Sequence, residues 1–406
     1  MPAARKMRAV SKGDALDDGV VIVGGGLAAQ RCAEALRRGE YSGRLRIVCG
    51  EPHRPYDRPP LSKELLQVEP EVAAESPAFR PEAWYQERNI ELLLATSATA
   101  LDPDAHRLEL ADGSAVSYEK LVIATGARPR TLPLFDGYSN VSTLRTLEDS
   151  RLLRGLLTQG GRLAVIGAGF IGQEVAAAAR AAGVDVAVIE LESLPLIGLL
   201  GPEVGRWFAE LHSAEGVELI LGEVVSSIGG EDRIESLTLS DGRSVACDHV
   251  LIGVGVTSDV GWLEAAGLPA TGVPTDAAGR SELPDVFAAG DAAAVYDPFL
   301  AQHVVSGHWE AASRQGIQVA GALLGREPAP SPLPSFWSDQ YGTRIQYLGH
   351  AQLAEAVTID GDTAARDFVA HYTRDGELVA AVAVGRPRAV GELRERLSYL
   401  TEGAPS

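Results

Sequence analysis

The stretch Val20-Val-Ile-Val-Gly-Gly-Gly-Leu-Ala-Ala29 decides the fold. Its four β-branched residues predict a buried strand, which runs directly into the pattern Gly24-x-Gly26-x-x-Ala29 and then into a row of helix formers. Small residues at such a turn let the backbone approach a pyrophosphate, whose charge then faces the unpaired N–H groups and the dipole of the helix N-terminus. Glu51 follows the next expected strand, where an acid would hold the adenosine ribose hydroxyls. This stretch therefore predicts a dinucleotide-binding unit.

The same arrangement recurs in Leu163-Ala-Val-Ile-Gly-Ala-Gly-Phe-Ile-Gly172, where all three glycines of the fingerprint are present. The strand that follows the alanine-rich helix ends in Glu190. A carboxylate there accepts both ribose hydroxyls and repels a 2′-phosphate, and none of the next three residues is an arginine that could bind one. The second unit is therefore expected to prefer NADH over NADPH.

Length and charge restrict the classes of function. A chain of 406 residues is too long for one ordinary core, so two or three domains are expected. With 36 basic and 55 acidic residues the formal charge is −19, which argues against nucleic acid or an anionic membrane as the main partner. No stretch approaches the roughly 20 apolar residues of a membrane span, and the polar N-terminus lacks the apolar region of a signal peptide. A cytoplasmic protein is expected.

The three cysteines, Cys32, Cys49 and Cys247, form no C-x-x-C pair. Their spacing disfavours a disulfide framework, a metal site and a cysteine-based redox centre, and favours buried inert thiols.

Several short motifs lie near the expected nucleotide sites. The positive groups of Arg58 and Lys63 could stand beside an electron-rich ring or a pyrophosphate, or belong to a solvated loop. Glu174, one turn into the second helix, could reach a nicotinamide carboxamide or a neighbouring lysine, or merely stabilise the helix dipole. The carboxylate of Asp291, in a Gly-Asp turn after a short strand, could accept hydrogen bonds from ribityl hydroxyls. A lone Trp337 would usually be a core residue.

These features predict an α/β fold with two Rossmann-like dinucleotide-binding domains and a C-terminal α+β domain. The family resemblance given below implies FAD as the ligand of the first domain and NAD as that of the second. The proline-rich segment 325–334 is the clearest linker. The expected boundaries are a disordered extension at 1–18, an FAD-binding domain at 19–120 and 250–325, an NAD-binding domain at 121–249, and a C-terminal domain at 326–406.

The chain resembles the ferredoxin-reductase family of flavoproteins, close to putidaredoxin and rubredoxin reductases and to the reductase components of aromatic-ring dioxygenases. The similarity spans about residues 19 to 400. It is carried by the two fingerprints, Arg58-Pro-Pro-Leu-Ser-Lys63, Ala124-Thr-Gly126, Ala289-Gly-Asp291, His308-Trp309 and Phe336-Trp-Ser-Asp-Gln-Tyr341.

The resemblance implies where the cofactors lie. For FAD it implies Gly24, Gly26, Ala28, Ala29, Glu51, Arg58, Lys63, Ala98, Arg145, Asp291 and Trp309. For NADH it implies Gly167, Gly169, Phe170, Ile171, Gly172, Glu174, Glu190 and Gly255. Lys63 and Glu174 would flank the stacked nicotinamide and flavin, and Trp337 would cover the flavin ring. Gly307 departs from the family pattern, in which a glutamate precedes the His-Trp pair, and this affects the hydrogen bonding at the pyrimidine end of the flavin.

The leading functional hypothesis is an NADH:ferredoxin oxidoreductase that feeds electrons to an oxygenase system. NADH gives hydride and an iron–sulfur protein takes single electrons, and a flavin can do both. A monomer or weak homodimer is expected. The candidate docking patch consists of Arg386, Arg388, Arg394 and Arg396; interleaved glutamates leave an ordinary solvated helix face as the alternative.

Two other hypotheses stay open. In the first, the electrons pass to a small molecule, as in NADH oxidases, disulfide reductases or monodehydroascorbate reductase. The first two of these need a cysteine near the flavin, where this chain has Ser62. In the second, the chain is a nucleotide-sensing interaction protein with slow turnover, like apoptosis-inducing factor.

Overall fold

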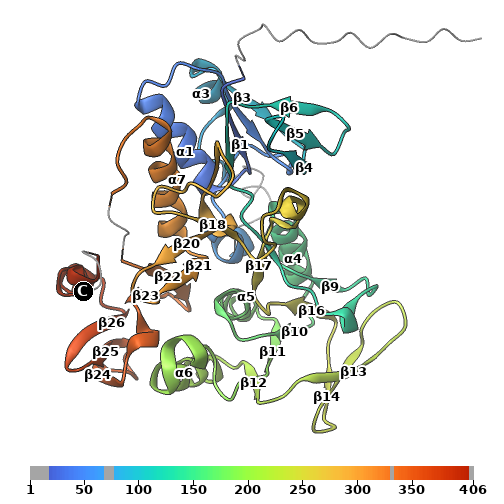
Figure 1. Ribbon diagram of the computed structural model, residues 1–406. Coiled ribbons are helices and arrows are strands. Elements are labelled where there is room, and N and C mark those ends of the chain that lie inside the picture. Colours follow the sequence, from blue (N-terminus) through green and yellow to red (C-terminus); the bar gives the residue numbers. More distant parts are fainter. Residues whose placement is uncertain (1–17, 68–76, 330–332, 402–406) are drawn as a thin grey trace, which may run out of the picture.

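The first stretch forms the centre of a parallel sheet. The structure, a computed structural model, describes residues 18–67, 77–329 and 333–401 (Figure 1). The first five-stranded sheet has the order β19 (Val286–Ala288), β7 (Lys120–Ile123), β1 (Val20–Val23), β2 (Leu45–Val48) and β3 (Ile90–Leu93). All its pairs are parallel, and every residue of β1 is buried, as a strand covered on both faces requires. Helix α1 (Leu27–Arg38) crosses over this sheet and packs along α7 (Trp309–Leu323), which comes from a distant part of the sequence (Figure 1).

The second fingerprint builds a second parallel sheet. Its order is β12 (Glu218–Leu221), β11 (Asp185–Glu190), β10 (Arg162–Ile166), β16 (His249–Ile252) and β9 (Val141–Ser142). Its helices are α4 (Leu147–Gln159), α5 (Phe170–Ala181) and α6 (Ile197–Ala214). Helix α4 begins with a capping box, in which the Thr146 hydroxyl accepts a hydrogen bond from the Asp149 amide and the Asp149 carboxylate accepts one from the Thr146 amide.

The chain passes between the two sheets a few residues later than the sequence suggested. Boundaries at 120/121 and 249/250 would cut through β7 and β16, yet β7 completes the first sheet and β16 the second. The two crossing segments then pair with each other as the antiparallel strands β8 (Ala127–Pro129) and β17 (Val256–Ser258). Most residues of β7 and all residues of β16 are buried, as strands covered on both faces of their sheets require.

Smaller elements complete the two units. Two antiparallel sheets are formed by β4 (Ala98–Asp102), β5 (Arg107–Leu110) and β6 (Ala115–Ser117), and by β13 (Val225–Gly229), β14 (Ser236–Leu239) and β15 (Ser244–Ala246). A mixed sheet is formed by β18 (Val273–Thr275), β20 (Ala293–Asp297) and β21 (Gln302–Val304), in which β20 pairs in parallel with β18 and antiparallel with β21. The short helices include η1 (Pro59–Ser62), α2 (Glu64–Gln67), α3 (Glu82–Glu87), η3 (Pro133–Phe135), η4 (Gly261–Ala266) and η5 (Gly290–Ala292).

The C-terminal unit is α+β, as expected. Its antiparallel sheet has the order β22 (Ser335–Gln340), β23 (Thr343–Gly349), β26 (Glu377–Val384), β25 (Asp367–Arg374) and β24 (Ala356–Asp362). It is completed by η6 (Ala351–Leu353), α8 (Ala389–Arg396) and η7 (Ser398–Thr401). Asp375 and Gly376 both have positive φ and turn β25 into β26, a conformation for which an Asp-Gly pair is favoured.

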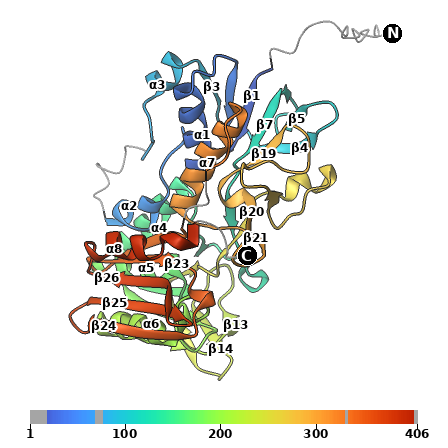
Figure 2. The same cartoon turned by 60° about the vertical axis from the view of Figure 1, so that its left-hand side comes forward.

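This third sheet is covered on both faces (Figure 2). One face packs on α6, where Trp207 and Phe208 meet Phe368 and Tyr372, and the other packs on α8 through Leu393. The C-terminal unit is therefore fixed to the second dinucleotide unit by a continuous apolar core. The predicted extension at 1–18 lies outside the described residues except for Asp18.

Candidate active site

A cleft of about 420 Å³ opens where the carboxyl ends of both parallel sheets face the first strand of the C-terminal sheet. Residues that follow β1, β7 and β19 line it from the first unit, and residues that follow β10 and β16 line it from the second. The carboxyl ends of parallel strands are where open α/β sheets bind ligands. The predicted site residues that line this cleft are Gly26, Ala28, Arg58, Lys63, Arg145, Gly169, Phe170, Ile171, Glu174, Gly255, Asp291, Trp309 and Trp337.

The first glycine turn leaves room for a ligand at one position and none at another. At Gly24, where φ is +133°, an added Cβ would lie 2.0 Å from the Ala124 carbonyl oxygen, so only glycine fits against the neighbouring strand. At Gly26, which precedes α1, an added Cβ would meet no atom within 4 Å. The turn is thus tight against its own sheet and open towards the cleft, as a cradle for a pyrophosphate requires.

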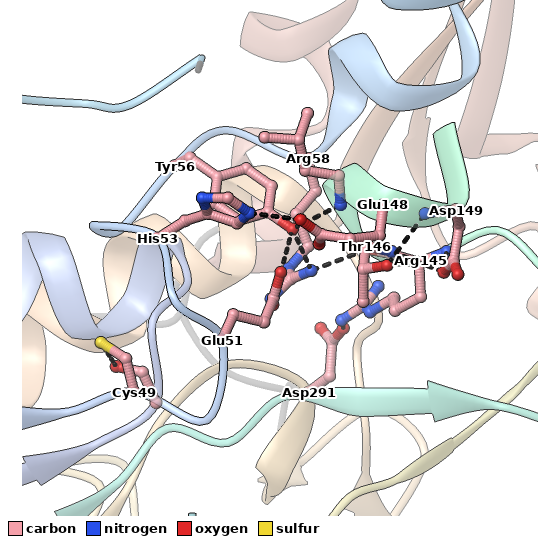
Figure 3. A network of polar contacts seen from close by, with 12 residues as sticks. Cys49, Glu51, His53, Tyr56, Arg58, Arg145, Thr146, Glu148, Asp149 and Asp291 are labelled. Atoms are coloured by element: carbon pink, nitrogen blue, oxygen red, sulfur yellow. Dashed lines mark hydrogen bonds and ion pairs between the residues drawn. The ribbon is translucent and has the colours of Figure 1, made fainter. Parts of the chain in front are cut away.

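A network of charged and polar side chains connects Glu51, Arg58, Arg145 and Asp291 (Figure 3). Glu51 accepts hydrogen bonds from the Tyr56 hydroxyl (2.6 Å) and from Nη2 of Arg58 (2.8 Å). Arg58 also donates to the Arg145 carbonyl oxygen (2.7 Å), and Nη2 of Arg145 lies 3.0 Å from Oδ2 of Asp291. Burial raises the pKa of Tyr56, so its hydroxyl remains a donor. Arg58 is therefore part of the site's charge network, and the solvated-loop alternative does not apply to it.

Two donors in the cleft have no partner in the described part of the chain. The hydroxyl of Thr125 and Nε of Arg145 are both buried without a hydrogen bond, and both residues line the cleft. Because buried polar groups are nearly always paired, these atoms indicate that a ligand with acceptor oxygens binds here. Together with the open Gly26 they fit the diphosphate and ribityl groups of FAD.

The second glycine turn has tighter constraints. An added Cβ would lie 2.6 Å from the Gly253 carbonyl oxygen at Gly167, and 2.3 Å from the Gly167 carbonyl oxygen at Gly172. Glu190 is fixed beside this turn, since Oε2 accepts from the Ala168 amide (2.6 Å) and Oε1 from the Glu192 amide (2.9 Å). The carboxylate predicted to select NADH is thus already oriented at the edge of the nucleotide cradle.

Lys63 and Glu174 form an ion pair in the cleft lining. Nζ of Lys63 lies 2.7 Å from Oε2 of Glu174, and the two side chains are 12% and 3% exposed. Among the three roles considered for Glu174, this geometry selects pairing with a lysine over simple stabilisation of the dipole of α5. Two serines, Ser62 and Ser338, also donate to the same carboxylate.

Aromatic side chains form one wall of the cleft. The rings of Trp309 and Trp337 lie edge to face with centroids 5.7 Å apart, and Nε1 of Trp309 donates to Asp57 (2.7 Å). Phe336 stacks between His308 and Tyr347 with centroids 4.6 Å from each. Trp337 is therefore a cleft residue and not the core residue that a lone tryptophan would usually be.

The model for pyridine nucleotide-disulphide oxidoreductases matches residues 18–316, and the reductase C-terminal model matches residues 335–402. The chain belongs to the pyridine nucleotide-disulphide oxidoreductase family. The expected relationship to the ferredoxin reductases among these flavoproteins, and the fold that it implies, are confirmed.

Three relatives of this family illustrate the relationship. The chain is 38% identical to the ferredoxin–NAD(+) reductase component of an anthranilate 1,2-dioxygenase system from Burkholderia cepacia, over 94% of each chain. It is similar to the crystal structure of the ferredoxin reductase for the CYP199A2 system of Rhodopseudomonas palustris, with 36% identity, a TM-score of 0.86 and 91% coverage of each chain. It is also similar to the reductase in a covalent putidaredoxin reductase–putidaredoxin complex, with 31% identity and a TM-score of 0.89 over 96% of this chain and 94% of that one.

The family is named after disulfide oxidoreductases, but the cleft of this chain contains no cysteine that could form a redox-active disulfide. Cys32, Cys49 and Cys247 are free and buried, and none of them lines the cleft. Burial raises the pKa of Cys32 and Cys49 to about 12 and that of Cys247 to about 11, so all three stay protonated thiols at neutral pH. Ser62 lies in the cleft beside Lys63.

Some predicted site residues lie outside the cleft lining. They are Gly24, Ala29, Glu51, Ala98, Gly167, Gly172 and Glu190. The glycines and Ala29 belong to the two turns. Glu190 contacts the second turn through the Ala168 amide, and Glu51 contacts the cleft residues Tyr56 and Arg58. Ala98 begins β4, directly after a loop whose Thr96 amide donates to the Cys49 carbonyl oxygen. Gly307 lines the cleft with φ +66°, a conformation in which a glutamate would be strained.

Other residues of the cleft were not predicted as site residues. Tyr56, Asp57 and Thr125 line it, and Ser338 reaches Glu174 from β22. A signal for Ser338 exists in the sequence: if Phe336 to Tyr341 is a strand, its period of two places Ser338 and Gln340 on the same face as Phe336. Polar residues on an apolar face need partners, which the structure supplies.

The arginines proposed for docking fall into two groups. Arg386 pairs with Asp367 and Asp360, and Arg394 pairs with Glu310. Arg388 and Arg396 are exposed and form no ion pair with described residues. Within the described ranges there is also no group of three metal-ligating side chains, and no helix that is long and apolar enough to cross a membrane.

Proposed function

We propose that this chain is an FAD-dependent NADH:ferredoxin reductase that serves an oxygenase system. The observation that carries the proposal is one cleft shared by two nucleotide cradles, with the Lys63–Glu174 ion pair and no cysteine in its lining. The relatives named above, which are reductases of a dioxygenase, of a CYP199A2 system and of putidaredoxin, support the choice of electron acceptor.

FAD is assigned to the first unit. The N-terminus of α1 would hold the diphosphate, Glu51 the adenosine ribose, and Asp291 the ribityl hydroxyls. Thr125 and Arg145 have the unpaired donors that its oxygens require. Bound FAD supplies the chemistry of accepting a hydride and releasing single electrons.

NADH is assigned to the second unit. The N-terminus of α5 would bind its diphosphate and Glu190 its adenosine ribose, which leaves the nicotinamide end near Lys63 and Glu174. The ion pair holds the Lys63 ammonium and the Glu174 carboxylate in fixed positions, and their charges cancel. The nicotinamide would therefore bind beside polar groups that are already oriented. Trp309 and Trp337 also line the cleft, and their rings would exclude water from the bound cofactors.

The acceptor is an iron–sulfur protein of the ferredoxin type. Since the chain carries a formal charge of −19, an acidic carrier would need a local positive patch. Arg388 and Arg396 are the candidates that remain, because their side chains are exposed and Arg386 and Arg394 are already paired.

Stopped-flow reduction by NADH, followed by cytochrome c reduction with and without an added ferredoxin, tests the proposal. The expected result is rapid flavin reduction and cytochrome c reduction that depends on the ferredoxin. Turnover without the carrier would favour a small-molecule reductase, and very slow flavin reduction would favour a nucleotide-sensing interaction protein; either result contradicts the proposal.

A pair of lysine variants adds a control. Lys63→Gln should slow flavin reduction by about tenfold or more, since it removes the charge paired with Glu174 in the cleft. Lys120→Gln removes a lysine that is likewise paired with a carboxylate, Asp285, but lies on β7 outside the cleft lining, and it should leave the rate unchanged.

A further inference from the structure

The Glu174 carboxylate joins three distant parts of the chain. It projects from α5, accepts from Ser62 and Lys63 on Oε2, and accepts from Oγ of Ser338 on Oε1 at 2.6 Å. Ser338 belongs to β22 of the C-terminal unit and is fully buried. Both carboxylate oxygens are therefore fixed, one by the first unit and the other by the C-terminal unit.

Ser338 is the end of a longer chain of buried groups. Nε2 of Gln340 lies 3.2 Å from Oγ of Ser338, and Oε1 of Gln340 lies 3.0 Å from Nε2 of His212 on α6. Nδ1 of His212 lies 2.8 Å from the Tyr341 hydroxyl. Gln340 and His212 are at most 1% exposed, so water does not compete for these hydrogen bonds.

The direction of every hydrogen bond in this chain is determined. The Glu174 carboxylate only accepts, so Ser338 uses its single proton on Glu174 and must accept from Gln340. The Gln340 carbonyl oxygen then faces His212, which must carry its proton on Nε2. Burial lowers the pKa of His212 to about 4, so the neutral ring accepts at Nδ1 from Tyr341. All four hydrogen bonds therefore run in the same direction, with the Tyr341 hydroxyl as the first donor and the Glu174 carboxylate as the final acceptor.

We propose that Ser338 is a positioning residue for the nicotinamide site, which fixes the Glu174 carboxylate beside Lys63 and is itself oriented by the chain Tyr341–His212–Gln340. The proposal rests on the proposed function, in which Glu174 meets the nicotinamide. Its consequence is that the C-terminal unit contributes to hydride transfer through a polar contact with α5 as well as through Trp337.

This series of hydrogen bonds also explains why polar residues lie within the otherwise apolar contact between α6 and the C-terminal sheet. Trp207, Phe208 and Leu211 of α6 pack on Phe336 and Tyr347 of the C-terminal sheet, and His212 lies in that same helix. A buried histidine paired on both nitrogens fixes the register of α6 against β22, because a shift of either element would leave buried polar groups unpaired.

Ser338→Ala in the holoenzyme tests the positioning role, with Ser335→Ala as the matched control. Ser335 lies on the same strand, is also buried, and donates to a different carboxylate, Glu310. Ser338→Ala should lower the limiting rate of flavin reduction by NADH about tenfold, because a freed carboxylate misplaces the reacting group. The Kd for NAD+, measured by titration calorimetry, should change less than about threefold, since the assigned sites of the diphosphate and the adenosine ribose are the second glycine turn and Glu190, which Ser338 does not contact. Ser335→Ala should leave both unchanged.

A Ser338→Ala rate within twofold of wild type would overturn the proposal, as would equal losses in both variants. The wild-type protein gives a second test that needs no variant. In an NMR spectrum of protein labelled with ¹⁵N-histidine, the chemical shifts of the His212 ring should show a protonated Nε2 and an unprotonated Nδ1 at neutral pH. A proton on Nδ1 would reverse the chain and contradict the proposal. If NADH does not reduce the wild-type flavin, the proposed function fails instead.

Discussion

Substitution of two helical glycines by alanine separates the nucleotide cradle from general stability. An added Cβ at Gly172 would lie 2.3 Å from the Gly167 carbonyl oxygen and 3.2 Å from Cγ1 of Val165. The first distance is about 1 Å shorter than an ordinary contact, so the start of α5 must move away from the turn by a similar amount. In Gly155→Ala on α4, the same change meets no atom within 4 Å.

The two substitutions should have different effects on the free energy of unfolding. Alanine in a helix interior is favoured over glycine by about 1 kcal/mol, so Gly155→Ala should stabilise the protein by about that amount. At Gly172 this gain is offset by an overpacking cost of about 1–3 kcal/mol, and the displaced α5 carries Glu174 with it. The Kd for NAD+ should rise by about tenfold to a hundredfold, which corresponds to about 1.4–2.8 kcal/mol, because the displaced N-terminus of α5 would no longer fit the diphosphate.

Calorimetric titration with NAD+ and urea unfolding of both variants provide the measurements, with flavin content as a check on the first unit. Flavin content should be unchanged, because Gly172 lies in the second sheet's turn. The reasoning is refuted if Gly172→Ala binds NAD+ with wild-type affinity, or if Gly155→Ala weakens binding to the same extent.

Three further predictions concern single features. Glu190→Gln should raise the KM for NADH by about tenfold, because a hydrogen bond to a charged group is worth about 1.5–3 kcal/mol. The variant should also prefer NADH over NADPH less strongly than the wild type does. An unchanged ratio of the KM for NADPH to the KM for NADH would contradict this. Thr146→Ala removes the capping box of α4 and should cost about 1 kcal/mol in urea unfolding, whereas Thr158→Ala near the other end of the same helix should cost less. Arg388→Glu with Arg396→Glu should raise the KM for the ferredoxin and flatten its salt dependence, while reduction of ferricyanide stays constant; unchanged ferredoxin kinetics would remove this patch from the docking surface.

Local sequence patterns were sufficient to predict those parts of the fold in which a few neighbouring residues determine the backbone conformation. The β-branched run at Val20, the two glycine turns and the Asp375-Gly376 hairpin each specify their backbone within a few residues. Their burial and positive φ angles are those that the patterns require. By contrast, β24 was not predicted, since most of its residues are exposed and its end is acidic.

The site itself depends on contacts that sequence spacing does not reveal. Glu174 had several plausible partners, and only the fold brings Lys63 and Ser338 to it from 111 and 164 residues away. The same holds for the docking arginines, because Arg386 and Arg394 are neutralised by acids that lie close only in three dimensions. A charge in the sequence therefore indicates a surface only after its pairing is known.

The central claim is that NADH and FAD meet in one cleft without sulfur chemistry between them. Anaerobic titration of the purified holoprotein with NADH, followed by addition of an oxidised ferredoxin, tests it most directly. We expect about one equivalent of NADH to bleach the visible flavin absorption, and the ferredoxin to restore it. A protein that stays colourless after reconstitution with FAD, or a bound flavin that NADH does not bleach, would contradict the account.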